Sequence, residues 1–444
     1  MTIDHGSGWR EVYRRMRGRQ LGLVTFGYAI FYFVRKNIPV ALPLMEKQFG
    51  VGKTELGAFL TAGDSVYGIS KLANGFVGDR SSARWLMAAG LALSALLNGL
   101  FGLASSAVVL GILWMINGWF QGMGYPPCAR ILSHWFEPTE RGRMWGIWNA
   151  SHTAGAAGVL VLAGWLGQSY GWRAVFLVPA AIALASSAVL ALWLRDTPGS
   201  LGLPPVEVYR GGGEPSVREG AVPVAEYRRL LRERVFSNRV VWLASIANFF
   251  VYTVRLAFLN WAPTFLSQEK HVKLAAAAVM TAGFELAGVL GAYSAGWLTD
   301  RVFGTRRAPV CAFYMLATAA AIVGFWQMPE GELVGSVMLL LVIGFFIYGP
   351  QFLVALIVAD QSGKHAAAVA VGVTGVFGYA SSLLSGVTLG AILEYEGWDG
   401  GFAMLAGAAL IGAIPFVLCW NSRPVVEPAQ NASGSAERPS HSQT

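Results

Sequence analysis

Long apolar stretches, separated by short polar segments, run along almost the whole chain. Each stretch has about 18–25 residues, the length that an α-helix needs to cross a lipid bilayer. Twelve of them predict an all-α membrane protein with twelve transmembrane helices. They cover residues 21–44, 57–77, 85–104, 107–127, 144–167, 174–194, 240–266, 274–298, 308–326, 334–358, 366–392 and 400–420.

A polar segment rich in Pro, Gly and Arg divides these stretches into two sets of six. The tail after the last stretch is rich in Ser, Pro and Ala, a composition that favours disorder. The predicted order is a cytoplasmic amphipathic head at 1–20, an N-terminal bundle at 21–194, a cytoplasmic linker at 195–239, a C-terminal bundle at 240–420 and a disordered cytoplasmic tail at 421–444.

Three features of the first half recur in the second half in the same order. Their spacings are nearly constant, at 220, 221 and 224 residues. Internal repeats of this kind are typical of transporters, whose substrate sites lie where the two halves meet. We therefore expect two pseudo-symmetric six-helix bundles. The recurring pairs are Arg35 and Arg255, Asp79 and Asp300, and Pro126 and Pro350.

Composition agrees with a membrane protein and excludes several other classes. Of the 444 residues, 55% are hydrophobic and only 13% are charged, whereas soluble proteins carry roughly 25% charged residues. The net charge of +8 does not indicate nucleic-acid binding, because no segment outside the membrane is large enough for such a domain. Cys128, Cys311 and Cys419 are scattered, which excludes a disulfide framework and gives no metal-ligand spacing. We find no nucleotide-binding motif and no nucleophile–base pair, so we expect neither an enzyme nor a cofactor or metal.

The positive charges define an orientation. Of the 33 Lys and Arg residues, 24 fall on the side that holds both termini and the linker, 5 fall on the opposite side and 4 lie inside spans. Because Lys and Arg are enriched in cytoplasmic loops, both termini are expected to be cytoplasmic. The excess of positive charge is thus mainly an orientation signal.

The four cations inside spans are Arg35, Lys36, Lys71 and Arg255, and only two acids, Asp64 and Glu285, accompany them. A charge in mid-bilayer is costly and normally faces a cavity or a partner. One interpretation is structural, with the arginines paired to these acids. The other is functional, because two unmatched positive charges would suit a dianionic ligand. The planar guanidinium of arginine binds phosphate or carboxylate bidentately, which favours an anion site between the halves.

Other polar residues lie near these cations in the sequence. Lys71 follows Asp64 by seven residues, on the same helix face, so that it either pairs with Asp64 or contacts a ligand. His152 is a lone histidine in an apolar span, which favours a hydrogen-bonded packing role over a proton or phosphate contact. Tyr28 and Tyr32 precede Arg35 by seven and three residues, and Tyr252 precedes Arg255 by three. The charged ends of spans two and eight, Asp79, Arg80, Asp300 and Arg301, are expected to pair with neighbouring helix ends in a gating or structural role.

Several ordered motifs resemble those of the organophosphate:phosphate antiporters of the major facilitator superfamily, over about residues 25–400. The resemblance implies alternating access by two six-helix bundles in a bacterial-type inner membrane. It implies exchange of a sugar or glycerol phosphate for inorganic phosphate. The motifs are FYFVRKN, YGISKLANGFVGDRSSARW, GWFQGMGYPPCARILSHWFEPTERG, WNASH, RDTPGSLGLPP, VYTVR, FELAG and IYGPQ.

The same resemblance assigns roles to residues. It makes Arg35 and Arg255 the two phosphate-binding arginines, and it adds Lys71 and His152 to the site. The polar residues that it places along the cavity are Tyr28, Tyr32, Asn149, Tyr252, Tyr348 and Tyr379.

Two positions depart from the family pattern. The family commonly has an acid five residues after the second arginine, where it can pair with the lysine that follows the first. Here that position is Asn260, which leaves Lys36 without its usual partner. Conversely, Asp64 stands where an uncharged residue is expected. Two explanations stay open. The acid that the family has at the position of Asn260 is replaced here by Asp64 in the first half, or the cavity favours a different anion.

Within the family, the stretches SARWLMAAGLALSALLNGLFG and WFEPTERG most resemble the glucose-6-phosphate and hexose-phosphate members. The resemblance therefore implies hexose 6-phosphate as the substrate and inorganic phosphate as the exchanged ion. The lipid bilayer is the other expected partner, and no nucleic acid is expected. We expect a monomer. Glycerol 3-phosphate, phosphoglycerate and a non-transporting sugar-phosphate sensor of the same fold stay open as alternatives. A proton-coupled symporter that uses Asp64, Glu285 or His152 is a further alternative.

Overall fold

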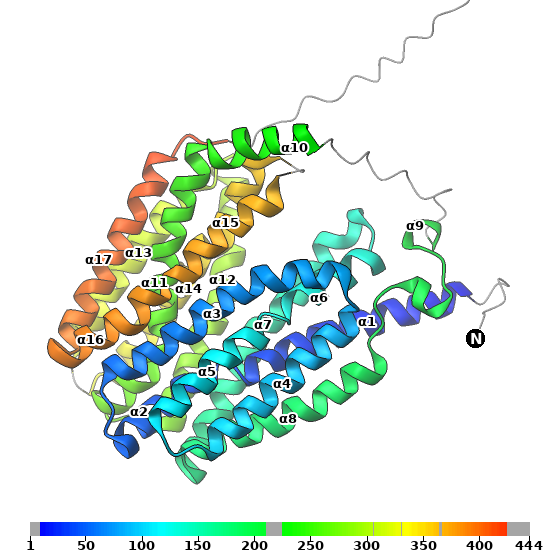
Figure 1. The fold of residues 1–444 in the computed structure, drawn as a ribbon. Coiled ribbons are helices and arrows are strands. Elements are labelled where there is room, and N and C mark those ends of the chain that lie inside the picture. The colour runs from blue at the N-terminus through cyan, green and yellow to red at the C-terminus, as the bar shows by residue number, and fades with distance from the viewer. Residues whose placement is uncertain (1–8, 210–223, 305, 330, 364–365, 424–444) are drawn as a thin grey trace, which may run out of the picture.

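The computed structural model describes residues 9–209, 224–304, 306–329, 331–363 and 366–423 (Figure 1). These residues form helices joined by short connections, and this part of the chain contains no strand. The first half comprises α1 (Trp9–Phe33), α2 (Ile38–Phe49), α3 (Lys53–Arg80), α4 (Ala83–Leu103), α5 (Ala107–Gln121), α6 (Tyr125–Trp135), α7 (Pro138–Tyr170) and α8 (Trp172–Trp193).

The linker carries a 3₁₀ turn η1 (Pro198–Leu201), α9 (Val206–Tyr209), α10 (Val224–Leu231) and a π-helical turn η2 (Arg232–Phe236). The second half comprises α11 (Arg239–Gln268), α12 (Leu274–Arg301), α13 (Ala308–Trp326), α14 (Leu333–Ser362), α15 (Ala367–Ala380), the π-helical turn η3 (Leu384–Thr388), α16 (Leu389–Tyr395) and α17 (Gly397–Leu418).

Ten helical segments of the described residues are long and apolar enough to cross a membrane. They match the third to twelfth predicted spans. The first two predicted spans correspond to α1 with α2 and to α3, which are also helical but contain more charged residues. The prediction of an all-α, multi-pass membrane protein is therefore confirmed.

One helix, α1, runs through the predicted head and into the first predicted span. Gln20 is completely buried, and its side-chain oxygen accepts a hydrogen bond from the backbone N–H of Arg195 at 2.8 Å. Tyr13 is also fully buried, stacked on Tyr209 of α9 with ring centroids 4.2 Å apart. The head continues the helix because its inner face packs against the linker and the bundle.

The first predicted span is interrupted at residues 34–37, between α1 and α2. Pro39 explains the interruption, because proline has no N–H to donate and its ring collides with the carbonyl four residues earlier. Interruptions also occur at residues 122–124, between α5 and α6, and at the π-helical turn η3. Irregular backbone at membrane depth is tolerated where protein surrounds it or where it lines a cavity.

Figure 1 shows the helices of the first half grouped beside those of the second half, with α10 across the ends of the second group. We call the end of the molecule with the linker the linker side. Six hydrogen bonds that involve side chains join the two groups in the described part of the chain. All six lie toward the end of the molecule opposite the linker. They join Gln268 to Glu46, Thr54 to Glu394, Ala275 to Gln168, Ser65 to Ser382, and Thr61 to both Ser382 and Val387.

On the side opposite the linker, Thr61 of the first half binds to the irregular backbone around η3 of the second half. Its hydroxyl donates to the carbonyl of Ser382 at 2.8 Å and accepts from the N–H of Val387 at 2.9 Å. Trp261 satisfies a further backbone group of the same turn by donating to the carbonyl of Ser385 at 3.0 Å. The two halves are thus in direct polar contact on the side opposite the linker.

Candidate functional site

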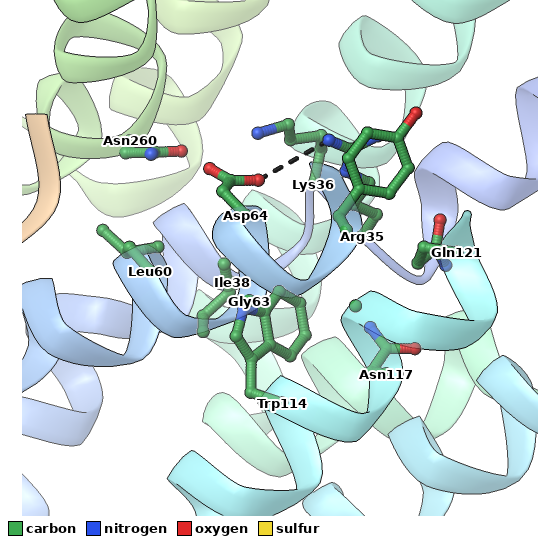
Figure 2. A pocket seen from close by; sticks show the side chains of 12 residues that line it. Arg35, Lys36, Ile38, Leu60, Gly63, Asp64, Trp114, Asn117, Gln121 and Asn260 are labelled. Carbon is green, nitrogen blue, oxygen red and sulfur yellow. Dashed lines mark ion pairs between the residues drawn. The ribbon is translucent and has the colours of Figure 1, made fainter. Parts of the chain in front are cut away.

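The interruption after α1 brings charged residues into a small internal cavity. Arg35 and Lys36 lie in the interruption, and Asp64 comes from α3 (Figure 2). The cavity has a volume of about 20 Å³, which suits about one water molecule. Gly118 lines it where α5 approaches α3 so closely that an added side-chain carbon would collide with the backbone of Gly63. Close approach of glycine-bearing helices is a common way to pack helices in a membrane.

Arg35 forms an ion pair with Asp64, with 3.5 Å between the guanidinium nitrogen and the carboxylate oxygen. Both residues are only 8% exposed. In the second half, Arg255 forms an ion pair with Glu285 of α12 at 3.4 Å, and Glu285 is completely buried. Each half therefore neutralises its own arginine with its own acid. This is the pairing that the structural interpretation of the sequence describes.

Each arginine also lies over an aromatic ring. The guanidinium carbon of Arg35 is 3.5 Å from the ring centroid of Tyr67, and that of Arg255 is 4.7 Å from the centroid of Tyr348. Such cation–π contacts contribute roughly 0.5–2 kcal/mol, more when they are shielded from water. They help to hold both guanidinium groups in place.

The two lysines have no carboxylate partner among the described residues. Lys36 lines the cavity and is 5% exposed. Lys71 does not pair with Asp64, which is the partner of Arg35. Its ammonium instead lies 4.2 Å from the ring centroid of Tyr125 and 5.9 Å from that of Tyr379. The surplus of two positive charges that the composition of the spans predicts therefore resides on the lysines rather than on the arginines.

Tyr28, Tyr32 and His152 form a neighbouring aromatic group. The rings of Tyr28 and Tyr32 lie 5.7 Å apart, and that of His152 lies 5.8 Å from Tyr32. The Nδ1 atom of His152 is hydrogen-bonded to the backbone carbonyl of Asn149, whose side chain is exposed. Tyr32 and His152 are each close enough to both Arg35 and Arg255 to interact electrostatically with them. The first and second halves therefore share this region.

Tyr379 of α15 connects the halves from the other side. Its ring lies 4.9 Å from that of Tyr67 in the first half and 6.0 Å from that of Tyr252 in the second. The structure thus brings four of the predicted tyrosines close to a cation, and Tyr28 packs against one of these four. The four are Tyr32, Tyr252, Tyr348 and Tyr379, at 5.7, 5.9, 4.7 and 5.9 Å from the nearest of the four cations.

Several buried polar atoms at this site have no hydrogen-bond partner. Asn260 is 1% exposed, and Figure 2 shows it facing Asp64 and Lys36 across the cavity. Buried polar groups are normally hydrogen-bonded, so these atoms keep unused hydrogen-bonding capacity within the described part of the chain. The atoms are Asn260 Oδ1, Arg255 Nε and Glu285 Oε2.

The gating role of Asp79, Arg80, Asp300 and Arg301 stays a prediction. The side chains of Asp79 and Arg80 lie outside the described part of the structure. Asp300 and Arg301 are exposed at the linker-side end of α12, and neither forms an ion pair with a described residue. Arg130 of α6 contacts the end of α3 by donating to the carbonyls of Gly78 and Ser81 at 2.7 and 2.6 Å.

Tyr67 and Tyr125 each contact a cation of the site, although neither is among the residues predicted from the sequence. Tyr67 lies three residues after Asp64 and four before Lys71, so helical spacing on α3 could have revealed it. Tyr125 follows the interruption of the fourth span, and only the tertiary structure brings it to Lys71. No group of three or more His, Cys, Asp or Glu residues within the described ranges could hold a metal ion.

The chain is similar in sequence to several known membrane proteins. The family model for the Major Facilitator Superfamily matches residues 24–386. A probable hexose phosphate transport protein of Chlamydia pneumoniae is 37% identical over 93% of each chain. A glycerol-3-phosphate transporter of Bacillus subtilis is 38% identical over 92% of this chain and 94% of the relative. The membrane sensor protein UhpC of Salmonella typhimurium is 35% identical over 90% and 91%.

Solved structures show a similar fold. A bacterial homologue of the human lysosomal transporter Spinster, in an inward-facing and unoccupied conformation, aligns with a TM-score of 0.69. The sequences are 17% identical, and the alignment covers 91% of this chain and 95% of the other. At this identity the likeness concerns the fold alone.

Proposed function

The chain belongs to the Major Facilitator Superfamily, and on that premise we propose that it exchanges a phosphorylated small molecule for inorganic phosphate. Membership makes it a multi-pass membrane transport protein rather than an enzyme. Relatives that carry hexose phosphate and glycerol 3-phosphate support an organic phosphate as the substrate. Hexose 6-phosphate is the best candidate, as the motif resemblance implies.

The observation that carries this proposal is the charge of the central site. Four buried or half-buried cations face two acids, and the two arginines occupy equivalent positions in the two halves. A phosphate dianion matches the surplus of two charges and accepts charge-assisted hydrogen bonds from both guanidinium groups. The lysines, which have no carboxylate partner, supply the charge, and the arginines supply the geometry.

The same arrangement explains why exchange would be preferred over one-way flux. Moving the two halves around an unneutralised site would carry surplus charge through a low-dielectric interface. A bound dianion removes that surplus and contacts both halves, so it would favour the reorientation. The polar contacts between the halves on the side opposite the linker support a conformation that is open on the linker side. The distribution of Lys and Arg supports the linker side as the cytoplasmic one.

Counterflow in proteoliposomes tests this function. Purified protein is reconstituted, the vesicles are loaded with unlabelled inorganic phosphate, and uptake of labelled phosphate or glucose 6-phosphate is followed. We expect rapid uptake that requires phosphate inside, with little uptake into empty vesicles. Equal uptake with and without internal phosphate would contradict exchange. Competition by hexose, glycerol and glycolytic phosphates would rank the substrates.

A sensor is the second candidate, because a membrane sensor protein is among the relatives. A sensor that does not transport would bind the phosphate ester in a direct binding assay but give no counterflow. The two measurements on one preparation therefore distinguish the candidates.

The amide at Asn260, where the family commonly has an acid, permits a test of whether the net charge of the site governs phosphate binding. We expect Asn260→Asp to weaken phosphate binding about tenfold, equivalent to about 1.4 kcal/mol. The added carboxylate would face Lys36 and reduce the surplus from two charges to one. The dissociation constant can be measured by titration calorimetry in detergent.

The matched control is the double variant Asp64→Asn with Asn260→Asp, in which the acid and the amide change places. It returns the surplus to two charges and is expected to recover phosphate affinity to within about threefold of the wild type. A double variant as weak as Asn260→Asp alone would show that the position of the acid, and not the total charge, governs binding.

A further inference from the structure

The interruption between α1 and α2 contains two of the four cations of the site. Because Arg35 and Lys36 lie outside a regular helix, the path of residues 34–37 sets the directions of both side chains. In the structure both side chains line the same cavity, and both are at least nine-tenths buried (Figure 2). The second half has no such break, because Arg255 lies inside the continuous helix α11.

This interruption leaves a backbone acceptor that needs new partners. In an unbroken helix the carbonyl of Val34 would accept from the N–H of residue 38, where α2 instead begins. A carbonyl that is buried without a partner costs several kcal/mol in a water-free environment. The interruption is therefore stable only if something else donates to this oxygen.

Three side-chain amides take that role. The Nδ2 atoms of Asn98 and Asn117 each donate to the carbonyl of Val34 at 3.0 Å, and Nε2 of Gln121 lies 3.4 Å from it. These residues come from α4 and α5 and are 1%, 2% and 4% exposed. Three buried donors on one carbonyl are far more than a chance contact.

The amides are themselves connected. Ser94 of α4 donates to the side-chain oxygen of Asn117 and accepts from Gln121 at 2.7 Å. Asn37, at the other end of the interruption, donates to Asn98 and to the carbonyl of Val175 in α8, both at 3.1 Å. Both ends of the interruption are thus fastened to α4, α5 and α8 through one buried network.

We infer that Asn98, Asn117 and Gln121 are positioning residues for the phosphate site. They hold the Val34 carbonyl, keep residues 34–37 out of the helix and so direct Arg35 and Lys36 together into the cavity. Asn117 and Gln121 also line the cavity, whereas Asn98 does not, and the hydrogen-exchange measurement below separates positioning from ligand contact. The inference rests on the proposed function for its ligand, but its structural part does not depend on it.

The test is Asn117→Leu, which keeps the approximate size of the side chain and removes the donor. The control is Asn74→Leu, the same substitution at a residue that is 3% exposed and whose amide bonds only to Ser70 of its own helix. Hydrogen exchange of the peptide that covers residues 30–40 is measured first. We expect Asn117→Leu to speed its exchange about tenfold, whereas Asn74→Leu leaves it unchanged.

Binding of inorganic phosphate is the second measurement. Asn117→Leu is expected to raise the dissociation constant about tenfold, and Asn117→Gln, which keeps an amide donor, to remain within about threefold of the wild type. If Asn117→Leu does not survive purification, Gln121→Met removes another of the donors and serves in the same comparison. Hydrogen exchange and phosphate affinity of Asn117→Leu equal to those of the Asn74→Leu control would overturn the inference.

A wild-type protein that does not bind phosphate would instead reject the proposed function. The hydrogen-exchange comparison would still decide whether the amides position residues 34–37.

Discussion

Lysine at either arginine position, Arg35→Lys or Arg255→Lys, is expected to lower phosphate counterflow about 100-fold. Lysine keeps the positive charge but loses the planar pair of donors that binds an oxyanion bidentately. Hydrogen bonds to charged groups are each worth about 1.5–3 kcal/mol. Lysine can replace one of the two, so the loss of the other corresponds to about one to two orders of magnitude. The measurement is the initial rate of labelled phosphate uptake into phosphate-loaded vesicles.

Arg173→Lys is a suitable control for this prediction. Arg173 stacks on Trp172, with 4.7 Å from its guanidinium carbon to the ring centroid, and reaches the carbonyl of Ala104 at 3.5 Å, away from the central cations. Its replacement should leave counterflow within about twofold of the wild type. Unimpaired exchange in either Arg35→Lys or Arg255→Lys would contradict a site built on two guanidinium groups.

The second large effect is expected from Glu285→Gln. Glu285 is completely buried and is the only described acid that pairs with Arg255. Removal of one member of a buried ion pair leaves an uncompensated charge and costs about 3–5 kcal/mol. We therefore expect thermal unfolding of the purified variant to begin at a clearly lower temperature. Added inorganic phosphate should restore more stability to the variant than to the wild type, because the anion supplies the missing negative charge.

Asp360→Asn provides the comparison for this experiment. Asp360 pairs with Arg307 at 3.1 Å, but the two side chains are 26% and 17% exposed. Water access makes such a pair worth only about 1 kcal/mol or less, and phosphate should not restore it selectively. A Glu285→Gln variant with the same stability as Asp360→Asn, or no response to phosphate, would show that the acid does not neutralise the central site.

The positions of the two arginines could be predicted from the sequence, but their surroundings could not. Repeat spacing relates Arg35 to Arg255, and the structure brings both near Tyr32 and His152. Helical spacing also predicts that Tyr32 shares a face with Arg35. In fact α1 ends at Phe33, and Tyr32 reaches the guanidinium of Arg35 at 5.7 Å because the chain turns there. Tyr32 is thus a neighbour of Arg35 as predicted, but the two residues do not lie on one face of a regular helix.

The partner of Asp64 shows where one-dimensional spacing fails. Seven residues along α3 place Lys71 on the same face, which makes it a plausible partner. Seven residues of helix also span about 10 Å along the axis, well beyond the reach of a direct ion pair unless both side chains bend toward each other. Arg35, from the interruption before α2, is closer in space and takes the carboxylate. Lys71 lies over Tyr125 instead.

By itself, the sequence determined that this protein crosses the membrane many times, that its halves repeat and that two arginines occupy equivalent positions. These properties depend on the length of apolar stretches and on spacing along one chain, because a lipid-exposed backbone has few alternatives to a helix. Only the tertiary structure decided which acid neutralises which cation and how Arg35 and Lys36 come to share a cavity. Ion pairs and amide hydrogen bonds act over about 3–4 Å, and the groups that meet here, such as Val34 with Asn117 and Arg255 with Glu285, lie tens of residues apart along the chain.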